Sequence, residues 1–300
     1  MIFRTRFAPS PTGPLHLGHA YSALLAYDTA LSKRGEFVLR IEDIDQSRAR
    51  PHWEQQIYND LHWLGLRWPT PVMRQSERLD LYQGALDRLW AKGLLYPCTC
   101  NRKDISAAVN APQEGAPLIG PDGIIYPGTC RSKGAANFSP DQRRPTDTVL
   151  RLDIAKAVRE ARKLLLSIQG GEIARFEERG QGPRGETGII EFSAQEMENT
   201  IGDVVLSRRD MGTSYHLSVV VDDGEQGITH VVRGQDLFEA TRIHVLLQVL
   251  LDLPTPIYIH HKLIRDENGK RLAKRDDARA IEKYRNDGVT PAGIRKLVGL

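Results

Sequence analysis

The sequence predicts an α/β protein with a Rossmann-like parallel sheet that binds a nucleotide. A β-compatible stretch over residues 2–8 leads through a loop rich in proline and glycine into a helical pattern that begins at Gly18. The apolar residues 37–41 have the pattern of a buried parallel strand, and carboxylates crowd its C-terminal end, where open α/β sheets bind ligands. Residues 228–237 have the pattern of a strand, a glycine turn and a helix start.

The other elements are expected from hydrophobic periodicity and β-propensity. Apolar residues spaced by three and four predict helices over residues 53–64, 79–92 and 237–250. Runs of β-compatible residues predict strands over residues 148–154, 201–208 and 214–223, the last two returning to the sheet. Residues 155–166 form a helix or an irregular insertion, and Asp236 is a candidate N-cap.

The first loop-to-helix junction is a candidate phosphate site. A helix N-terminus offers unpaired N–H groups and a partial positive charge, so anions bind there. His16 and His19 lie three residues apart at this junction, and an imidazole donates to a phosphoryl oxygen as negative charge builds up. Gly18 lets a ligand approach the backbone closely. The alternative interpretation is a loop with two surface histidines.

Carboxylates follow the strand over residues 37–41. Glu42, Asp43 and Asp45 lie at its C-terminal end, the edge at which parallel sheets bind ligands. Three carboxylates there bind a metal, an ammonium group or a ribose, or they cap the next helix.

The chain contains three cysteines, an odd number that argues against a disulfide framework. Cys98 and Cys100 could clasp a metal with Cys130 as a third thiolate. Structural zinc takes four ligands, and no histidine lies between His62 and His216, so a local fourth ligand is an oxygen. Its candidates are Tyr126, Asp122 and Asp104. The alternative is three reduced, partly buried thiols.

Length and composition limit the class of protein. Three hundred residues suggest one large or two modest domains. No segment approaches twenty uninterrupted apolar residues, which argues against a membrane span. The N-terminus enters a strand directly and lacks the apolar region of a signal peptide. We therefore expect a cytoplasmic protein.

Three motifs resemble those of the glutamyl-type class I aminoacyl-tRNA synthetases. The sequence RFAPSPTGPLHLGH at residues 6–19 is similar to their signature, with HLGH as the "HIGH" element. The sequence FVLRIEDID at residues 37–45 resembles another strand of the family, with Ile44 where threonine is usual. The segment RLAKR at residues 271–275 resembles their KMSKS loop. There, Arg271 replaces lysine and Ala273 replaces serine.

The resemblance implies a two-step reaction in which glutamate is activated by ATP and then transferred. It assigns the catalytic role to His16, His19 and Lys274, and ATP binding to these residues and Gly18, with Mg²⁺ on the phosphates. The implied glutamate site consists of Arg6, Phe7, Ala8, Pro9, Ser10, Glu42, Tyr215 and Arg233, with Glu42 near the ammonium group. Arginine suits carboxylate recognition, and a structural ion pair is the alternative for each arginine.

The cysteine pattern points to one family within this group of synthetases. The pattern CxC followed by YxxxC is similar to the zinc site of the glutamyl-queuosine tRNA synthetase family, which implies that Cys98, Cys100, Tyr126 and Cys130 bind one structural Zn²⁺. About 26 residues follow Lys274, so we expect no anticodon-binding domain. The implied partners are L-glutamate, ATP and tRNA(Asp) carrying queuosine, and we expect a monomer.

Three other functions remain open at this stage. The chain could be the catalytic core of an ordinary glutamyl-tRNA synthetase, a non-catalytic tRNA-binding relative or a small-molecule nucleotidylyltransferase. The expected organisation has five parts, namely the first half of the catalytic domain (1–96), a zinc-binding module (97–132), a connective insertion (133–200), the second half of the catalytic domain (201–255), and the KMSKS-type loop with a C-terminal helical segment (256–300).

Overall fold

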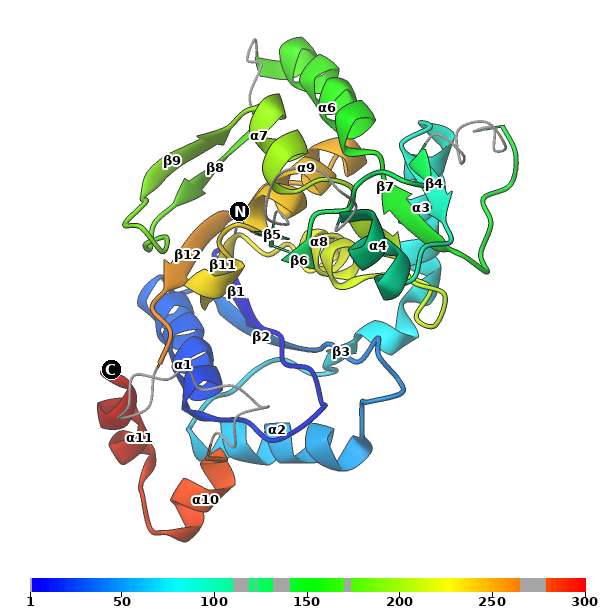
Figure 1. Cartoon of the computed structure of the whole chain (residues 1–300). Helices are drawn as coiled ribbons and strands as arrows, with labels where there is room; N and C mark the ends of the chain where they lie inside the picture. The colour runs from blue at the N-terminus through cyan, green and yellow to red at the C-terminus, as the bar shows by residue number, and fades with distance from the viewer. Residues whose placement is uncertain (1, 110–118, 122, 132–140, 170–173, 265–278) are drawn as a thin grey trace.

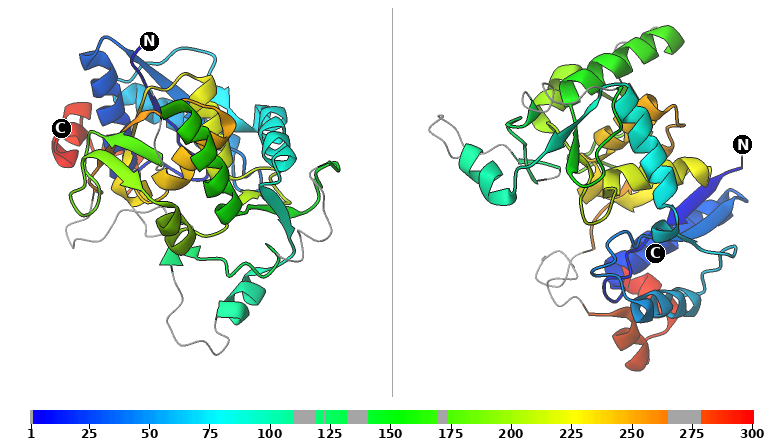
Figure 2. Two further views of the ribbon diagram at one scale, coloured as in Figure 1. Left: turned by 90° about the horizontal axis from the view of Figure 1, so that it is seen from above. Right: turned by 90° about the vertical axis from the view of Figure 1, so that its right-hand side faces the viewer.

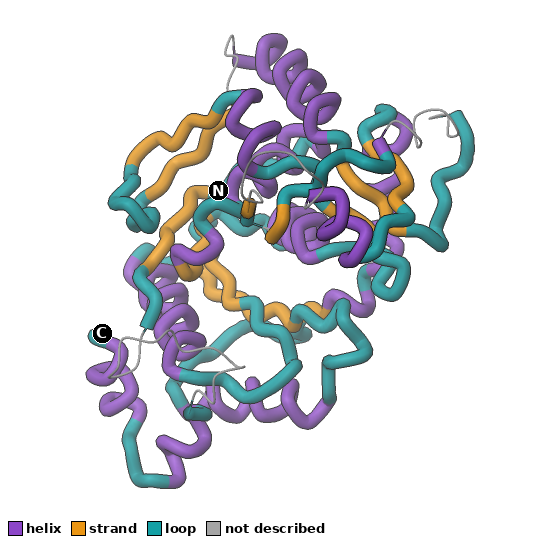
Figure 3. Tube along the Cα trace, viewed as in Figure 1, coloured by secondary structure: helices purple, strands orange, loops and turns teal. Residues whose placement is uncertain are grey.

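A central layer of strands separates two groups of helices in the computed structural model (Figures 1 and 3). The structure describes residues 2–109, 119–121, 123–131, 141–169, 174–264 and 279–300. One parallel sheet has the order β1-β2-β3, and a second has the order β11-β12-β8-β9, in which only the β8–β9 pair is antiparallel. These strands are β1 (Arg4–Phe7), β2 (Glu36–Ile41), β3 (Met73–Arg74), β8 (Ala174–Glu178), β9 (Gly188–Phe192), β11 (His230–Gly234) and β12 (Ile257–His261).

The two sheets meet at β1 and β11. The backbone N–H of Thr229, just before β11, donates to the Arg4 carbonyl of β1 at 3.0 Å. Strand β2 is added beside β1 on one side, and β12 is added beside β11 on the other. The strand order therefore reverses between β1 and β11. Ligands of open α/β sheets bind outside the strand C-termini at such a switch point. The predicted Rossmann-like α/β fold is therefore confirmed.

Neighbouring residues of β11 belong to different cores. Val231 packs into a core with α3 (Leu79–Ala91), α6 (Ile154–Gln169), α8 (Tyr215–Glu225) and α9 (Thr241–Leu251). Val232 packs with α1 (Leu17–Ser32), α2 (Pro51–Trp63), α10 (Ile281–Asn286) and α11 (Pro291–Val298). Because successive strand residues point to opposite faces, both faces of the layer are buried. Figure 2 shows the C-terminal helix α11 beside α1.

A third, antiparallel sheet carries the cysteine module. Its order is β10-β7-β4. The strands are β4 (Leu95–Cys98), β7 (Val149–Leu152) and β10 (Val205–Ser207). The other described elements are α4 (Arg102–Val109), the short antiparallel pair β5 (Ile119–Gly120) and β6 (Gly123–Ile124), and α7 (Ala194–Thr200), which packs on α6. Single-turn 3₁₀ helices cover Gln75–Glu77 and Gln235–Leu237.

Several predicted elements are confirmed, and three predictions were wrong. Helices α2 and α3 and strands β2 and β7 match their predicted segments, and residues 155–166 lie within α6. Residues 214–223 form α8 rather than a strand, because Ser214 caps a helix that is buried on all sides. Strand β10 joins the antiparallel sheet instead of the parallel one. Asp236 lies in a 3₁₀ turn and caps no α-helix, since α9 begins at Thr241.

Helix lengths also bear on the membrane prediction. Among the described residues, no helix combines the length and the apolar character that crossing a membrane requires.

Candidate active site

The two histidines of the first motif cap helix α1. His16 is the N-cap, and its Nδ1 accepts from the Gly18 N–H at 3.1 Å. The His16 N–H in turn donates to Nδ1 of His19 at 3.2 Å, and the two rings lie 3.8 Å apart. A neutral imidazole that accepts at Nδ1 carries its proton on Nε2. Both histidines are therefore oriented with Nε2–H as a donor at the positive end of a helix.

Helix α1 also holds the chain on either side of the KMSKS-type segment. Before this segment, His261 Nε2 lies 2.8 Å from the Ser22 hydroxyl. After it, the Ile281 N–H donates to the Leu15 carbonyl at 2.8 Å. Lys274, together with Arg271 and Ala273, lies outside the described residues. Both ends of the intervening segment are nevertheless fixed to the helix that His16 begins.

A buried cluster of charges lies beneath the strand ends. Arg6 contacts Asp223 through Nε–Oδ1 at 3.1 Å and Nη2–Oδ2 at 3.4 Å. Arg40, fully buried, reaches the same carboxylate at 2.7 Å and Glu42 at 3.1 Å. Burial raises the pKa of Asp223, but the attraction of Arg6 and Arg40 outweighs it and leaves this pKa below its usual range. Arg6 is thus held by a structural ion pair.

Glu42 behaves differently from Asp223. Burial raises its pKa more than Arg40 and Arg6 lower it, so the pKa of this carboxyl lies above its usual range. The backbone N–H of Glu42 donates to the Pro9 carbonyl at 3.0 Å, which joins the C-terminal ends of β1 and β2. A carboxylate in this position gains from a nearby ammonium group, because that charge offsets its desolvation.

Arg233 is the centre of a buried network at the end of β11. Its Nε donates to His260 at 3.1 Å and its Nη1 lies 3.1 Å from His244. Its Nη2 donates to the Thr241 hydroxyl at 2.6 Å and to the Leu237 carbonyl at 3.2 Å. Four of the five N–H groups of this guanidinium are therefore engaged within the described residues. One N–H remains for a ligand, which is fewer than two-point carboxylate recognition requires.

The histidines around Arg233 are neutral. Burial lowers the pKa of His260 to about 4, although Glu178 lies 2.5 Å from its Nδ1. Burial and the charge of Arg233 lower the pKa of His244 well below its usual value. An arginine side chain can only donate hydrogen bonds. The ring nitrogens that accept from Arg233, Nε2 of His260 and Nδ1 of His244, therefore carry no proton. The remaining proton of His244 then points to His216 Nδ1, 3.1 Å away.

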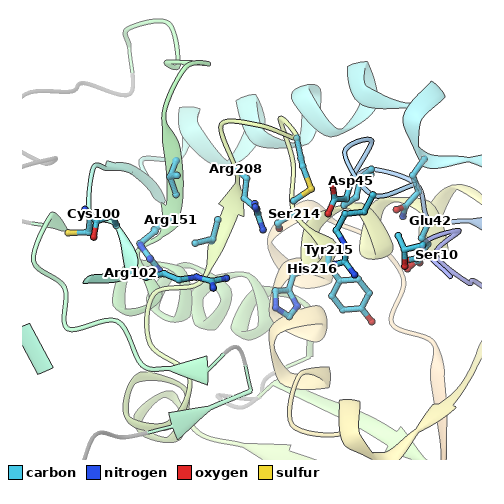
Figure 4. A pocket seen from close by; sticks show the side chains of 18 of the residues that line it. Ser10, Glu42, Asp45, Cys100, Arg102, Arg151, Arg208, Ser214, Tyr215 and His216 are labelled. Atoms are coloured by element: carbon cyan, nitrogen blue, oxygen red, sulfur yellow. The ribbon is translucent and has the colours of Figure 1, made fainter. Parts of the chain in front are cut away.

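A cavity of about 590 Å³ connects part of this site to the cysteine module (Figure 4). Ser10, Glu42 and Tyr215 line one end, and Cys100 and Arg102 line the other. Burial raises the pKa of the Tyr215 hydroxyl. We call this the site cavity.

Not every predicted glutamate residue lines the site cavity. Phe7, Ala8 and Pro9 do not, and Arg6 and Arg233 are buried behind it. Several residues that we did not predict also line it, among them Arg48, Arg102, Arg208 and His216. For Arg102 and Arg208, the sequence signal is a basic residue beside another, at Arg102-Lys103 and Arg208-Arg209.

The three cysteines and Tyr126 meet in one cluster. All three sulfur atoms lie within 4.8 Å of one another. The Tyr126 hydroxyl is 3.5 Å from Cys98 Sγ and 3.4 Å from Cys100 Sγ, and it accepts from the Cys130 N–H at 2.8 Å. Tetrahedral zinc with bonds of about 2.3 Å separates its sulfur ligands by roughly 3.8 Å. The four donors therefore fit a single metal ion.

The surroundings act differently on the thiols of the cluster. Burial raises the pKa of Cys100 to about 11. Arg151 donates to Cys98 Sγ at 3.3 Å and lies over the Tyr126 ring at 3.9 Å. Burial raises the pKa of Cys130, but hydrogen bonds from Tyr126 and Thr99 outweigh it and lower this pKa to about 6. Of the other predicted oxygen ligands, Asp104 accepts from the Asn101 N–H at 2.8 Å instead. Asp122 lies outside the described residues.

The sequence is similar to those of a known family of enzymes. Residues 2–163 and 173–300 match the family "tRNA synthetases class I (E and Q), catalytic domain". A "Glutamyl-Q tRNA(Asp) synthetase" of Rhodobacter capsulatus is 59% identical over 296 residues, which cover 99% of each chain. A protein of the same name from Symbiobacterium thermophilum is 39% identical, with 96% of this chain and 83% of that protein covered.

Solved structures of two glutamate tRNA ligases have a similar fold. The crystal structure of a glutamate tRNA ligase from Elizabethkingia meningosepticum, in complex with its amino acid, matches with a TM-score of 0.71 and 25% identity. The match covers 99% of this chain and 60% of that one. A glutamate–tRNA synthetase from Elizabethkingia anophelis gives a TM-score of 0.72. The chain therefore belongs to the class I tRNA synthetases for glutamate and glutamine, and within them to the glutamyl-Q tRNA(Asp) synthetase family.

Proposed function

We propose that this protein activates L-glutamate with ATP and transfers the glutamyl group to queuosine in the anticodon of tRNA(Asp). The observation that supports this best is the full-length similarity to glutamyl-Q tRNA(Asp) synthetases, at 59% identity for the Rhodobacter capsulatus protein. The structure adds a cavity that extends from Glu42 and Tyr215 to the cysteine module, which gives room for an acceptor beside the amino acid.

In the first step, the α-carboxylate of glutamate attacks the α-phosphorus of ATP. A new P–O bond forms, the bond to the β-phosphate oxygen breaks, and pyrophosphate leaves. His16 and His19 would donate through Nε2 to phosphoryl oxygens as negative charge builds up. Gly18 lies between them at the helix N-terminus, and Lys274 would add a positive charge. Mg²⁺ on the phosphates would neutralise part of their charge.

Glutamate would bind at the C-terminal ends of β1, β2 and β11. Ser10 and Tyr215, which line the site cavity, would form its walls, and Glu42 would accept from its ammonium group. Arg6 and Arg233 would attract its carboxylates from behind these walls. Because Arg233 keeps one N–H for a ligand, we propose a single hydrogen bond from it, supplemented by charge attraction.

In the second step, an acceptor hydroxyl attacks the glutamyl carbonyl carbon. An ester forms, the mixed anhydride breaks, AMP leaves, and the hydroxyl proton is released. We propose that Cys98, Cys100, Tyr126 and Cys130 hold one structural zinc ion. Zinc would fix the loop that carries Cys100 at the edge of the site cavity. We further propose that the protein acts as a monomer in the cytoplasm, where its tRNA substrate occurs.

The proposal is tested by two assays on the full chain. Glutamate-dependent exchange between ATP and pyrophosphate, without tRNA, reports the first step. Transfer of labelled glutamate to tRNA(Asp) with and without queuosine reports the second. We expect exchange, and transfer only to the queuosine-containing tRNA. Absence of exchange would reject activation, and charging of tRNA(Glu) at its 3′ end would identify an ordinary glutamyl-tRNA synthetase instead.

A further inference from the structure

Two arginines of the site cavity have no partner within the described part of the chain. Arg48 follows β2 and Arg102 begins α4, so they approach the cavity from different elements. Both side chains are exposed, and neither forms a side-chain hydrogen bond or ion pair with a described residue. Figure 4 shows Arg102 reaching from the cysteine module toward His216.

The other charged groups of the cavity have partners among the described residues. Arg151 is bound to Cys98 and the Asp203 carbonyl, and Arg208 forms a two-point pair with Asp210. Glu42 pairs with Arg40. The remaining lining carboxylate, Asp45, accepts from the Ser47 hydroxyl at 2.6 Å. Arg48 and Arg102 together therefore outweigh the single negative charge of Asp45.

The two arginines line the site cavity, but the histidines that would bind ATP do not. Neither His16 nor His19 lines the site cavity, whereas Cys100 and Asn101 do. An anion that contacts Arg48 and Arg102 therefore lies on the acceptor side of the bound amino acid. Guanidinium groups bind phosphates through paired N–H groups, and contacts to phosphates orient a nucleic acid without reading its sequence.

We infer that Arg48 and Arg102 bind backbone phosphates of the acceptor RNA strand on either side of the nucleoside that receives glutamate. This inference rests on the proposed function, and it assigns both residues to transfer rather than to activation. The two contacts hold the strand across the cavity, so that the acceptor hydroxyl faces the glutamyl carbonyl near Tyr215.

The test uses the full chain and two pairs of matched variants. Arg48→Ala and Arg102→Ala remove the proposed contacts. Arg50→Ala and Lys103→Ala remove positive charges one or two residues away, on side chains that are exposed and do not line the cavity. Thermal unfolding of each variant checks that the fold is retained.

We expect Arg48→Ala and Arg102→Ala each to raise the KM for queuosine-containing tRNA(Asp) about tenfold, the loss typical of one charged hydrogen bond. The slope of log KM against log salt should fall by about 0.7 for each lost phosphate contact. Exchange between ATP and pyrophosphate should keep the wild-type KM values for ATP and glutamate. The control variants should match the wild type in both assays.

Two results would overturn the inference. One is a tRNA KM and a salt slope that are the same in Arg48→Ala and Arg102→Ala as in Arg50→Ala and Lys103→Ala. The other is a raised KM for ATP in the exchange assay, which would show that the arginines bind the triphosphate. Loss of transfer by the wild-type protein is a separate outcome, because it rejects the proposed function itself.

Discussion

Replacing Asp223 by asparagine removes the charge that two buried arginines share. Arg6 and Arg40 both contact this carboxylate, at 3.1 Å and 2.7 Å, and all three residues are buried. Among the described residues, Arg40 keeps ion pairs with Glu42 and Asp222 in the variant, whereas Arg6 keeps a 3.5 Å contact to the Val232 carbonyl. Breaking a buried pair from one side costs about 3–5 kcal/mol. We expect Asp223→Asn to lower the free energy of unfolding by about 3 kcal/mol, the lower end of this range, because the oxygen of the asparagine amide still accepts one hydrogen bond.

The assays are urea unfolding and exchange between ATP and pyrophosphate. The KM for glutamate should rise roughly 10- to 100-fold, as Arg6 loses its orientation. The pKa of Asp223 is depressed, so its stabilisation exists above the unfolded pKa and is lost as the pH falls through the lower folded pKa. The variant should therefore lose stability at pH 7, and its difference from the wild type should shrink as the pH falls below the ordinary pKa of an aspartate. As a control, Glu36→Gln breaks the exposed pair with Arg4 and should cost less than about 1 kcal/mol. Equal losses of unfolding free energy in Asp223→Asn and Glu36→Gln would refute the reasoning.

Three further predictions concern the metal, a buried carboxyl and two glycines. Elemental analysis should find one zinc ion per chain. The Cys130→Ser variant should lose this zinc and unfold at a lower temperature. Wild-type protein that is folded but free of zinc would contradict the prediction. Burial raises the pKa of Asp60 to about 6, so its proton stabilises the fold at low pH and this contribution is lost as the pH rises through about 6. Asp60→Asn should therefore raise the unfolding temperature at pH 8 but not at pH 4, and an equal change at both pH values would argue against it. Gly35→Ala should destabilise strongly, because its Cβ would lie 2.2 Å from a backbone oxygen. Gly84→Ala, with open space on helix α3, should stabilise by about 0.5–1 kcal/mol, and urea unfolding compares the two.

The sequence predicted the fold wherever periodicity was distinct. Helices α2 and α3 expose one face and bury the other, so their spacing was readable. Helix α8 was mistaken for a strand because residues 216–223 are all buried. A segment that is buried all round has no periodic signal, and its run of three valines favours a strand. Only the Ser214 cap distinguished the two structures.

The site was predictable in part for a similar reason. His16 and His19 lie in one short motif, and the structure places them together as helix-capping residues. The arginines were expected to face a substrate, but their partners come from distant segments. Asp223 is 217 residues from Arg6, and His260 is 27 residues from Arg233. Such networks depend on tertiary packing, so local spacing does not indicate which N–H groups remain for a ligand.

The central claim is that glutamate is attached to the anticodon nucleoside of tRNA(Asp). The most direct measurement is the position of labelled glutamate in the tRNA after transfer, determined by nuclease digestion and separation of the fragments. The account predicts label in the anticodon-loop fragment, and none when guanosine replaces queuosine. Label on the 3′-terminal adenosine, or equal labelling of tRNA with and without queuosine, would contradict it.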